Sequence, residues 1–203
     1  YYDRAEEIYE KVLRKDPNNI KCLNNFSNLK QTLRDYETAK ELLLKALEIE
    51  EKNLNILFNL AECYQSLGEL DQAKDYAIKI LNLQPNHTAA HRFICGIINH
   101  RSDKSYFPKI IEIEKSDDFK NFSLEEKKDI YFSLGKAHED NQDYEKSFNY
   151  LQKANLIKNK EINYNLSSHE KLTKSIIKLF HDFDFGKIKK KSLENKIIFI
   201  CGM

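Results

Sequence analysis

The sequence is poor in the residues that break helices. Only five glycines and three prolines are spread over 203 residues, and tryptophan is absent. So few breakers over such a length favour an all-helical chain. Hydrophobic residues make up 41% and charged residues 32%, a balance typical of a globular chain and not of a disordered one. The length allows one or two domains.

A surplus of charge is also missing. Lysine and arginine total 33 against 32 acidic residues, which gives a formal net charge of +1. This near-balance argues against a general nucleic-acid or anionic-membrane binder, because such proteins carry a basic surplus. No signal peptide is present, and no apolar run is long enough to span a membrane. The first residue is Tyr1 and the chain starts in the middle of a pattern, so we interpret it as a piece of a longer protein.

Cysteine pairs and metal-ligand clusters are absent as well. The four cysteines, Cys22, Cys63, Cys95 and Cys201, are far apart and form no Cys-x-x-Cys pair. The first three fall near apolar positions of predicted helices, so we expect free, buried thiols in a reducing compartment, the cytoplasm. His87 and His91 have a spacing that can bind zinc, but no third ligand is fixed nearby. We therefore expect packed or surface histidines and no metal site.

What the chain does have is a period of 34 residues. Residues 54–85 contain two apolar stripes at helical spacing, separated by Gly68 and closed by Pro85. Steps of 34 residues align three alanines: Ala5, Ala39 and Ala73. Small residues at this place let paired helices approach closely. The order of large residue, alanine, glycine, alanine and closing proline resembles the tetratricopeptide repeat (TPR).

The period divides most of the chain into helix pairs. Its units are a half repeat at 1–17 and full repeats at 20–51, 54–85, 88–117 and 124–158. Phe107 and Pro108 stand where the third full repeat should have its small alanine, so we expect a distorted repeat or a short second helix there. Ser123 and Glu126 have the spacing of a capping box at the start of the last repeat. We expect an all-α fold, a right-handed TPR superhelix (α-solenoid) over residues 1–160.

Beyond residue 160 the period ends. Ser167 and Glu170 again have capping-box spacing, and apolar residues follow at helical intervals, so we predict a capping helix over 161–182. A lysine-containing stretch at 183–196 has the character of a solvated linker. The sequence IIFICGM at 197–203 is a continuous apolar run ending in glycine, which is typical of a buried parallel strand before a phosphate-binding loop.

The C-terminal part has a narrower resemblance. Residues 134–165, the helix at 168–181 and the strand at 197–203 are together similar to bacterial proteins that carry TPR repeats ahead of a sulfotransferase domain. The resemblance implies a parent protein, related to protein-tyrosine sulfotransferases, that binds 3′-phosphoadenylyl sulfate and transfers its sulfonate to an acceptor hydroxyl. This chain would supply only Gly202, the first residue of the phosphosulfate loop. It would supply no catalytic residue and hold no cofactor of its own.

Polar side chains recur on the predicted first helices, which line the concave groove in TPR superhelices. Amide side chains suit an extended peptide, because each can donate to and accept from a peptide backbone. Asn25 and Asn59 are one period apart, which resembles the asparagine ladder of some peptide-binding TPR proteins. The candidate groove residues are Lys21, Asn24, Asn25, Asn28, Asn55, Phe58, Asn59, Glu62, Arg92, Phe132 and Lys136.

Three functions remain open at this point. The preferred one is a TPR protein–protein interaction module that serves as the recruiting arm of a sulfotransferase and binds a protein or peptide in its groove. The second is a stand-alone adaptor with no catalytic partner. The third is an oligomerisation module that forms a homo-oligomer. No nucleophile elbow, dinucleotide fingerprint or complete phosphate loop occurs, so the residues themselves predict no chemistry.

Overall fold

The computed structural model describes residues 2–162 and 166–181, and within them the chain is entirely helical. It divides into two compact units, Tyr1–Glu161 and Ile162–Met203. The predicted linker at 183–196 and the predicted strand at 197–203, with Cys201 and Gly202, lie outside the described residues. None of the helices in the described part is long and apolar enough to cross a membrane.

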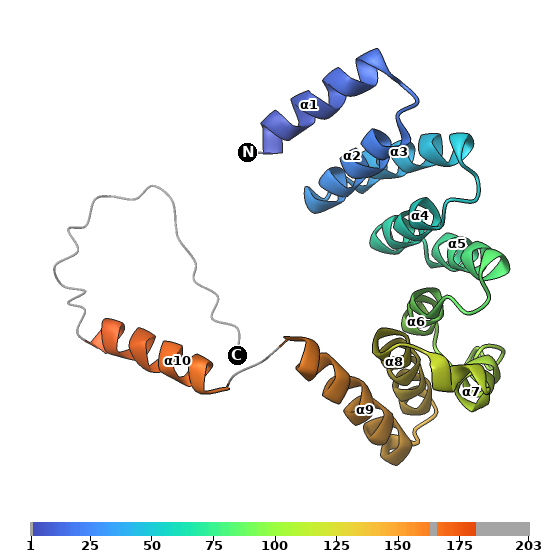
Figure 1. Cartoon of the computed structure of the whole chain (residues 1–203), viewed down its shortest axis with the longest axis vertical. Coiled ribbons are helices and arrows are strands. Elements are labelled where there is room, and N and C mark those ends of the chain that lie inside the picture. Colours follow the sequence, from blue (N-terminus) through green and yellow to red (C-terminus); the bar gives the residue numbers. More distant parts are fainter. Residues whose placement is uncertain (1, 163–165, 182–203) are drawn as a thin grey trace. The chain divides into compact units, whose positions relative to one another are not determined.

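The first unit, here called the solenoid, is a succession of short helices (Figure 1). In chain order these are α1 (Tyr2–Lys15), α2 (Ile20–Thr32), α3 (Tyr36–Ile49), α4 (Leu54–Ser66), α5 (Leu70–Leu83), α6 (Thr88–Ile97), α7 (Phe107–Lys115), the 3₁₀ helix η1 (Asp118–Asn121), α8 (Leu124–Asp140) and α9 (Tyr144–Ile162).

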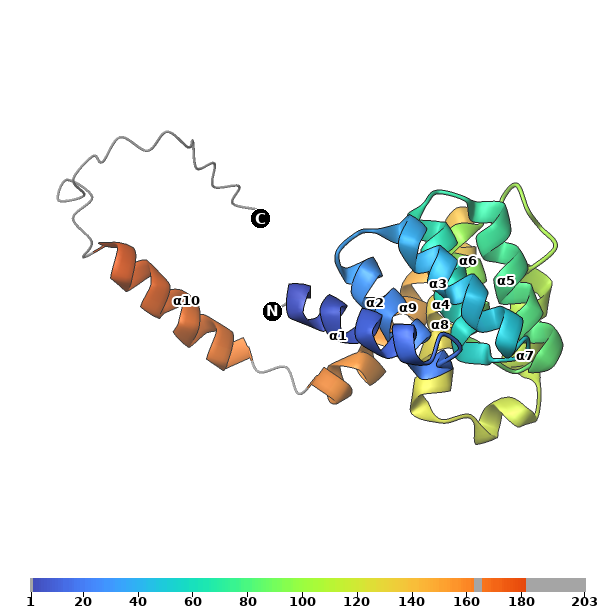
Figure 2. The same ribbon diagram turned by 90° about the horizontal axis from the view of Figure 1, so that it is seen from above.

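Helices of the solenoid pack mainly on their neighbours in sequence. The helix α2 packs along α3, and α4 packs along α5, while α3 packs on α4 and joins the two pairs. Figure 1 shows α2, α4, α6 and α8 along the inner side of the curved stack, with α3, α5 and α7 on the outer side. Figure 2 views the same helices from the α1 end. The TPR-like solenoid predicted from the period is therefore the observed architecture.

The repeated alanines form the centre of the core. Ala39 in α3 and Ala73 in α5 are fully buried, and so are Leu43 and Ile80 on the same helices. Full burial of a leucine or isoleucine side chain contributes about 1.5–3 kcal/mol. The alanines contribute by their small size, because it lets the first and second helix of each pair come close.

Helix starts and turns also follow the period. Asn19, Asn53 and His87 each accept a backbone N–H at the start of an inner helix. Ser123 does the same for α8 and forms the predicted capping box with Glu126. The turns after α2, α4 and α8 need a residue with positive φ, and these residues are Arg34, Gly68 and Gln142. Only glycine takes this conformation without steric strain.

The third full repeat departs from the pattern. The helix α6 ends at Ile97 and packs directly on α8, while α7 has only nine residues with Pro108 in its first turn. The predicted short second helix is confirmed. Instead of a small alanine, the Phe107 ring lies 6.0 Å from the His100 ring and 5.0 Å from the His138 ring. This bulk separates α7 from α6 and lets α8 take its place.

The second unit contains one described helix, α10 (Leu166–His181). The helix predicted in this region is present, but the predicted capping box is wrong. Ser167 lies inside the first turn of α10 and not before it. A capping box needs its serine at the N-cap, where the side chain can accept the N–H two or three residues on. The capping role of α10 stays a prediction.

Candidate functional site

Two adjoining pockets lie on the inner side of the solenoid. The first has a volume of about 480 Å³ and is lined by α4, α6 and α8: Phe58, Glu62, Gln65, Ala89, Arg92, Phe93, Gly96, Glu125 and Asp129. The second, of about 200 Å³, is lined by Arg92, Cys95, Gly96, Phe132, Ser133 and Lys136. Arg92 and Gly96 line both, so the two pockets adjoin, and together they are here called the groove.

The groove gathers five of the residues proposed from the sequence. Phe58, Glu62 and Arg92 line the first pocket, and Phe132 and Lys136 line the second. The remaining candidates lie on α2 and on the first two turns of α4, and they line neither pocket. Of these, Lys21, Asn25, Asn28 and Asn55 are exposed, whereas Asn24 and Asn59 are half-buried.

The asparagines of α2 and α4 form a hydrogen-bonded cluster. The Asn59 side-chain N–H₂ donates to Oδ1 of Asn24 at 2.8 Å and to Oδ1 of Asn28 at 3.2 Å. Asn25, which is one period before Asn59 in the proposed asparagine ladder, is exposed, whereas the two acceptors of the Asn59 side chain are Asn24 and Asn28. The cluster joins α2 to α4 and uses donors and acceptors that a peptide would otherwise meet.

Aromatic side chains form the apolar wall of the first pocket. The Phe58 and Phe93 rings meet edge-to-face with centroids 5.8 Å apart, and the His87 ring lies 6.2 Å from Phe58. Gly96 keeps the groove open, because a Cβ placed there would meet no heavy atom within 4 Å. A larger side chain at this position would fill the groove without striking the scaffold.

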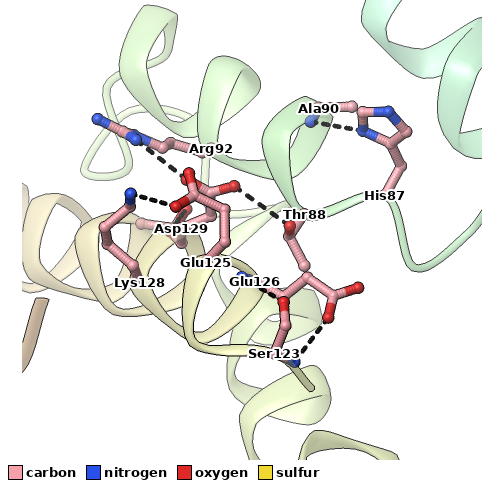
Figure 3. Close-up of polar contacts among 10 residues, drawn as sticks. His87, Thr88, Ala90, Arg92, Ser123, Glu125, Glu126, Lys128 and Asp129 are labelled. Atoms are coloured by element: carbon pink, nitrogen blue, oxygen red, sulfur yellow. Dashed lines mark hydrogen bonds and ion pairs between the residues drawn. The ribbon is translucent and has the colours of Figure 1, made fainter. Parts of the chain in front are cut away.

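A polar network joins α6 to α8 at the side of the groove (Figure 3). The Arg92 Nη1 donates to Oδ1 of Asp129 at 3.0 Å, and the Thr88 hydroxyl donates to Oδ2 at 3.2 Å. The Asp129 side chain is only 7% exposed, so these donors replace most of its hydration. The Arg92 guanidinium also lies over the Phe132 ring, 4.7 Å from its centroid. Both partners hold Arg92 across the border of the two pockets.

Charge differs between the two pockets. Glu62 lies on the wall of the first, where partial desolvation raises the pKa of its carboxyl group. Glu125, on the same pocket, pairs with the buried Lys128. The second pocket is bordered by Arg92 and Lys136, and Lys136 pairs with Asp140 behind it. The first pocket therefore offers a carboxylate, Glu62, whereas the lining of the second contains two cations that are each paired with an aspartate.

The buried histidine and cysteines have structural explanations. The Nε2 of His91 lies 2.8 Å from the Pro85 carbonyl oxygen, so it must carry the proton, and Nδ1 accepts from the Tyr106 hydroxyl at 2.6 Å. Cys22, Cys63 and Cys95 are buried and free, as predicted. Burial raises the pKa of Cys63 to about 11 and of Cys95 to about 12, so both remain thiols. The described residues contain no group of three or more metal-ligating side chains.

Sequence reasoning missed several residues of the groove, among them Phe93, Gly96, Glu125 and Asp129. A signal for two of them was present. Gly96 lies one period after the candidate Glu62. Asp129 lies four residues before Ser133, just as the candidate Asn55 lies four residues before Asn59. The longer connection between α6 and α8 shifts the register, and this hides the equivalence of Asp129.

Comparison with known proteins agrees with this architecture. The family described as Tetratricopeptide repeat matches residues 32–94 and residues 128–161. The chain therefore contains TPR repeats, and TPR repeats are modules of protein–protein interaction. A search of curated proteins finds no match.

Solved structures similar to the chain share its fold. A crystal structure of MamA is 22% identical, with a TM-score of 0.60 over 80% of this chain and 92% of MamA. A TPR protein from Parabacteroides merdae has the same TM-score and identity over 81% of this chain and 61% of its own. YrrB, described as a TPR protein with an unusual peptide-binding site, is 20% identical with a TM-score of 0.56, over 77% of each chain. Likeness at this level of identity concerns the fold alone.

Proposed function

We propose that the groove of α4, α6 and α8 binds an extended peptide segment of a partner protein. The observation that carries the proposal is the adjacency of the two pockets, which share Arg92 and Gly96. Together they are lined from α4, α6 and α8, which lie on the inner side of the stack (Figure 1). Adjoining pockets along one line suit the side chains of an extended chain. The peptide-binding site of YrrB, a protein of similar fold, gives further support.

The lining of the groove suits a peptide more than a compact apolar ligand. Phe58 and Phe93 supply apolar surface, while Gln65 and Arg92 supply hydrogen-bond donors for peptide carbonyls. Arg92 is fixed by Asp129 and Phe132, so its free N–H groups are already oriented before a ligand arrives. A preorganised donor loses less conformational entropy on binding.

The test begins with peptides selected from a random library on the full 203-residue chain. Their affinity is then compared on two variants, Gly96→Leu and Gly96→Ala. The leucine fills the border of the two pockets, so we expect a loss of affinity of about tenfold or more. The alanine adds only a Cβ in open space and should leave affinity within about twofold of wild type. Equal affinity for the wild-type chain and Gly96→Leu would refute the groove as the binding site.

A finer proposal concerns the parent protein. The resemblance of residues 134–165 and 197–203 to TPR–sulfotransferases supports a role as the arm that recruits the sulfate acceptor. Its test is a sulfonate-transfer assay with 3′-phosphoadenylyl sulfate on the full-length parent, with and without residues 1–158. Loss of transfer to a protein acceptor, but not to a small phenol, is the expected result. A parent that transfers no sulfonate leaves the stand-alone adaptor or the oligomerisation module.

A further inference from the structure

The first pocket of the groove carries an uncompensated negative charge. Glu62, Glu125 and Asp129 line it together with one cation, Arg92. Asp129 is bound to Arg92, and Glu125 pairs with Lys128. Within the described residues no cation pairs with the Glu62 carboxylate, and burial raises the pKa of this group.

The surroundings of Glu62 fit a cation with an apolar stem. Phe58 lies one turn before it on α4, and its ring meets that of Phe93 on α6. Lysine and arginine side chains bury their methylene stems on apolar surface, and their cations are attracted to aromatic rings. Gln65, on the next part of α4, adds an amide oxygen that accepts a hydrogen bond from such a cation.

The second pocket has the opposite character. Arg92 and Lys136 border it, and no acidic side chain lines it. A peptide cation placed there would meet no carboxylate of the pocket lining, whereas the first pocket offers Glu62. A basic side chain of the peptide is therefore favoured in the first pocket over the second, and this preference would fix the register of a bound peptide.

We propose that the first pocket binds one lysine or arginine side chain of the partner peptide, with its cation against Glu62 and its stem against Phe58 and Phe93. The inference rests on the peptide-binding function proposed above and specifies its ligand. The ligand is an extended basic segment of a protein and not a nucleic acid, which would bring phosphate charge to an acidic pocket.

The test uses library-selected peptides that lose affinity on Gly96→Leu, so that binding in the groove is already established. Each basic residue of such a peptide is replaced in turn by norleucine, which keeps most of the stem and removes the charge. At one peptide position we expect the norleucine replacement to lower the affinity for the wild-type chain about fivefold. The same replacement should not lower the affinity for Glu62→Gln any further. Glu139→Gln is the matched control, because it removes the same charge from an exposed place on α8 outside both pockets. On this control the norleucine replacement should still cost about fivefold.

The outcomes separate the two proposals. The inference is overturned if the peptides that bind in the groove contain no basic residue. It is also overturned if norleucine replacement lowers peptide affinity equally on Glu62→Gln and on the wild-type chain. Either result leaves the peptide groove itself intact. Equal effects of Glu62→Gln and Glu139→Gln also overturn the inference, since net charge would then explain the result. A library that yields no peptide sensitive to Gly96→Leu refutes the groove itself, and the inference with it.

Discussion

Arg92 on α6 and Asp129 on α8 form an ion pair of 3.0 Å in which the aspartate side chain is only 7% exposed. In a regular repeat α6 would pair with its own second helix, but here it packs on α8. The pair joins these two helices at the side of the groove (Figure 3). The residues that hold α6 on α8 therefore also line the groove for which we propose peptide binding.

Replacement of Asp129 by alanine should lower the free energy of unfolding by about 1–3 kcal/mol, because the Thr88 hydroxyl and Arg92 lose their acceptor at a buried site. Urea unfolding measures the change. Asp117→Ala is the control, since Asp117 and Lys120 form an exposed pair worth at most about 1 kcal/mol. Equal effects of the two substitutions would mean that the network does not support the junction.

His100 is fully buried, and neither of its ring nitrogens has a hydrogen-bond partner among the described residues. An unsatisfied buried polar group costs about 1–3 kcal/mol, so His100→Leu should raise the free energy of unfolding. His91→Leu should lower the free energy of unfolding by a similar amount, because both ring nitrogens of His91 form hydrogen bonds, one with Tyr106 and one with Pro85. Urea unfolding at pH 7.5 compares the two. A loss of stability in both variants would contradict the account of His100.

The stability of the solenoid should fall in mild acid. Burial lowers the pKa of His91, His100 and His138 below the ordinary 6.5. The unfolded chain then binds protons more readily than the folded one. The contribution of these neutral histidines to the free energy of unfolding is fully present above pH 6.5. It is lost as the pH falls through that value toward the pKa values of the folded state. Carboxylates such as Asp103 and Asp140, whose pKa values are also lowered, lose their contribution only below about pH 4.

Urea midpoints at pH 8, 7, 6 and 5 test this, and we expect a decline between pH 7 and 5. His100→Leu should make the decline shallower. A midpoint that stays constant from pH 8 to 5 would contradict the burial of neutral histidines.

Two glycines on inner helices should respond to alanine in opposite ways. At Gly135 a Cβ would lie 2.6 Å from Cδ2 and 2.8 Å from Cγ of Leu151 in α9, so Gly135→Ala forces the Leu151 side chain to move from its packed position. We expect a loss of about 1 kcal/mol or more. At Gly96 the space is open, so Gly96→Ala should be neutral or stabilising by about 0.5 kcal/mol. Thermal and urea unfolding of both variants provide the comparison, and losses of equal size would contradict it.

The regular part of the fold was predictable because it rests on short-range patterns. Ala39 and Ala73 keep one position in the period, and both are fully buried where paired helices meet. The groove was only partly predictable. Phe58, Glu62 and Arg92 follow from the same period, but Asp129 joins them because α8 packs on α6 in place of α7. That exchange follows from the bulk of Phe107 and from the longer connection before α8, and a repeat pattern contains neither effect.

Hydrogen bonding set a second limit on prediction. The period aligned Asn25 with Asn59, yet Asn59 donates to Asn24 and Asn28. Equivalence in sequence identifies the face of a helix, whereas contact across two helices depends on how they cross. Side-chain pairs between repeats therefore need the three-dimensional structure.

The most direct test of the central claim is a backbone and side-chain amide NMR titration of the full chain with a library-selected peptide. The account predicts that the shifted signals cluster on α4, α6 and α8, including Gln65, Phe93 and Gly96, and that Gly96→Leu abolishes them. Signals of the exposed residues Ile78 and Leu83 on α5 should stay in place. Shifts confined to α5 or to α10, with the groove signals unchanged, would contradict the account.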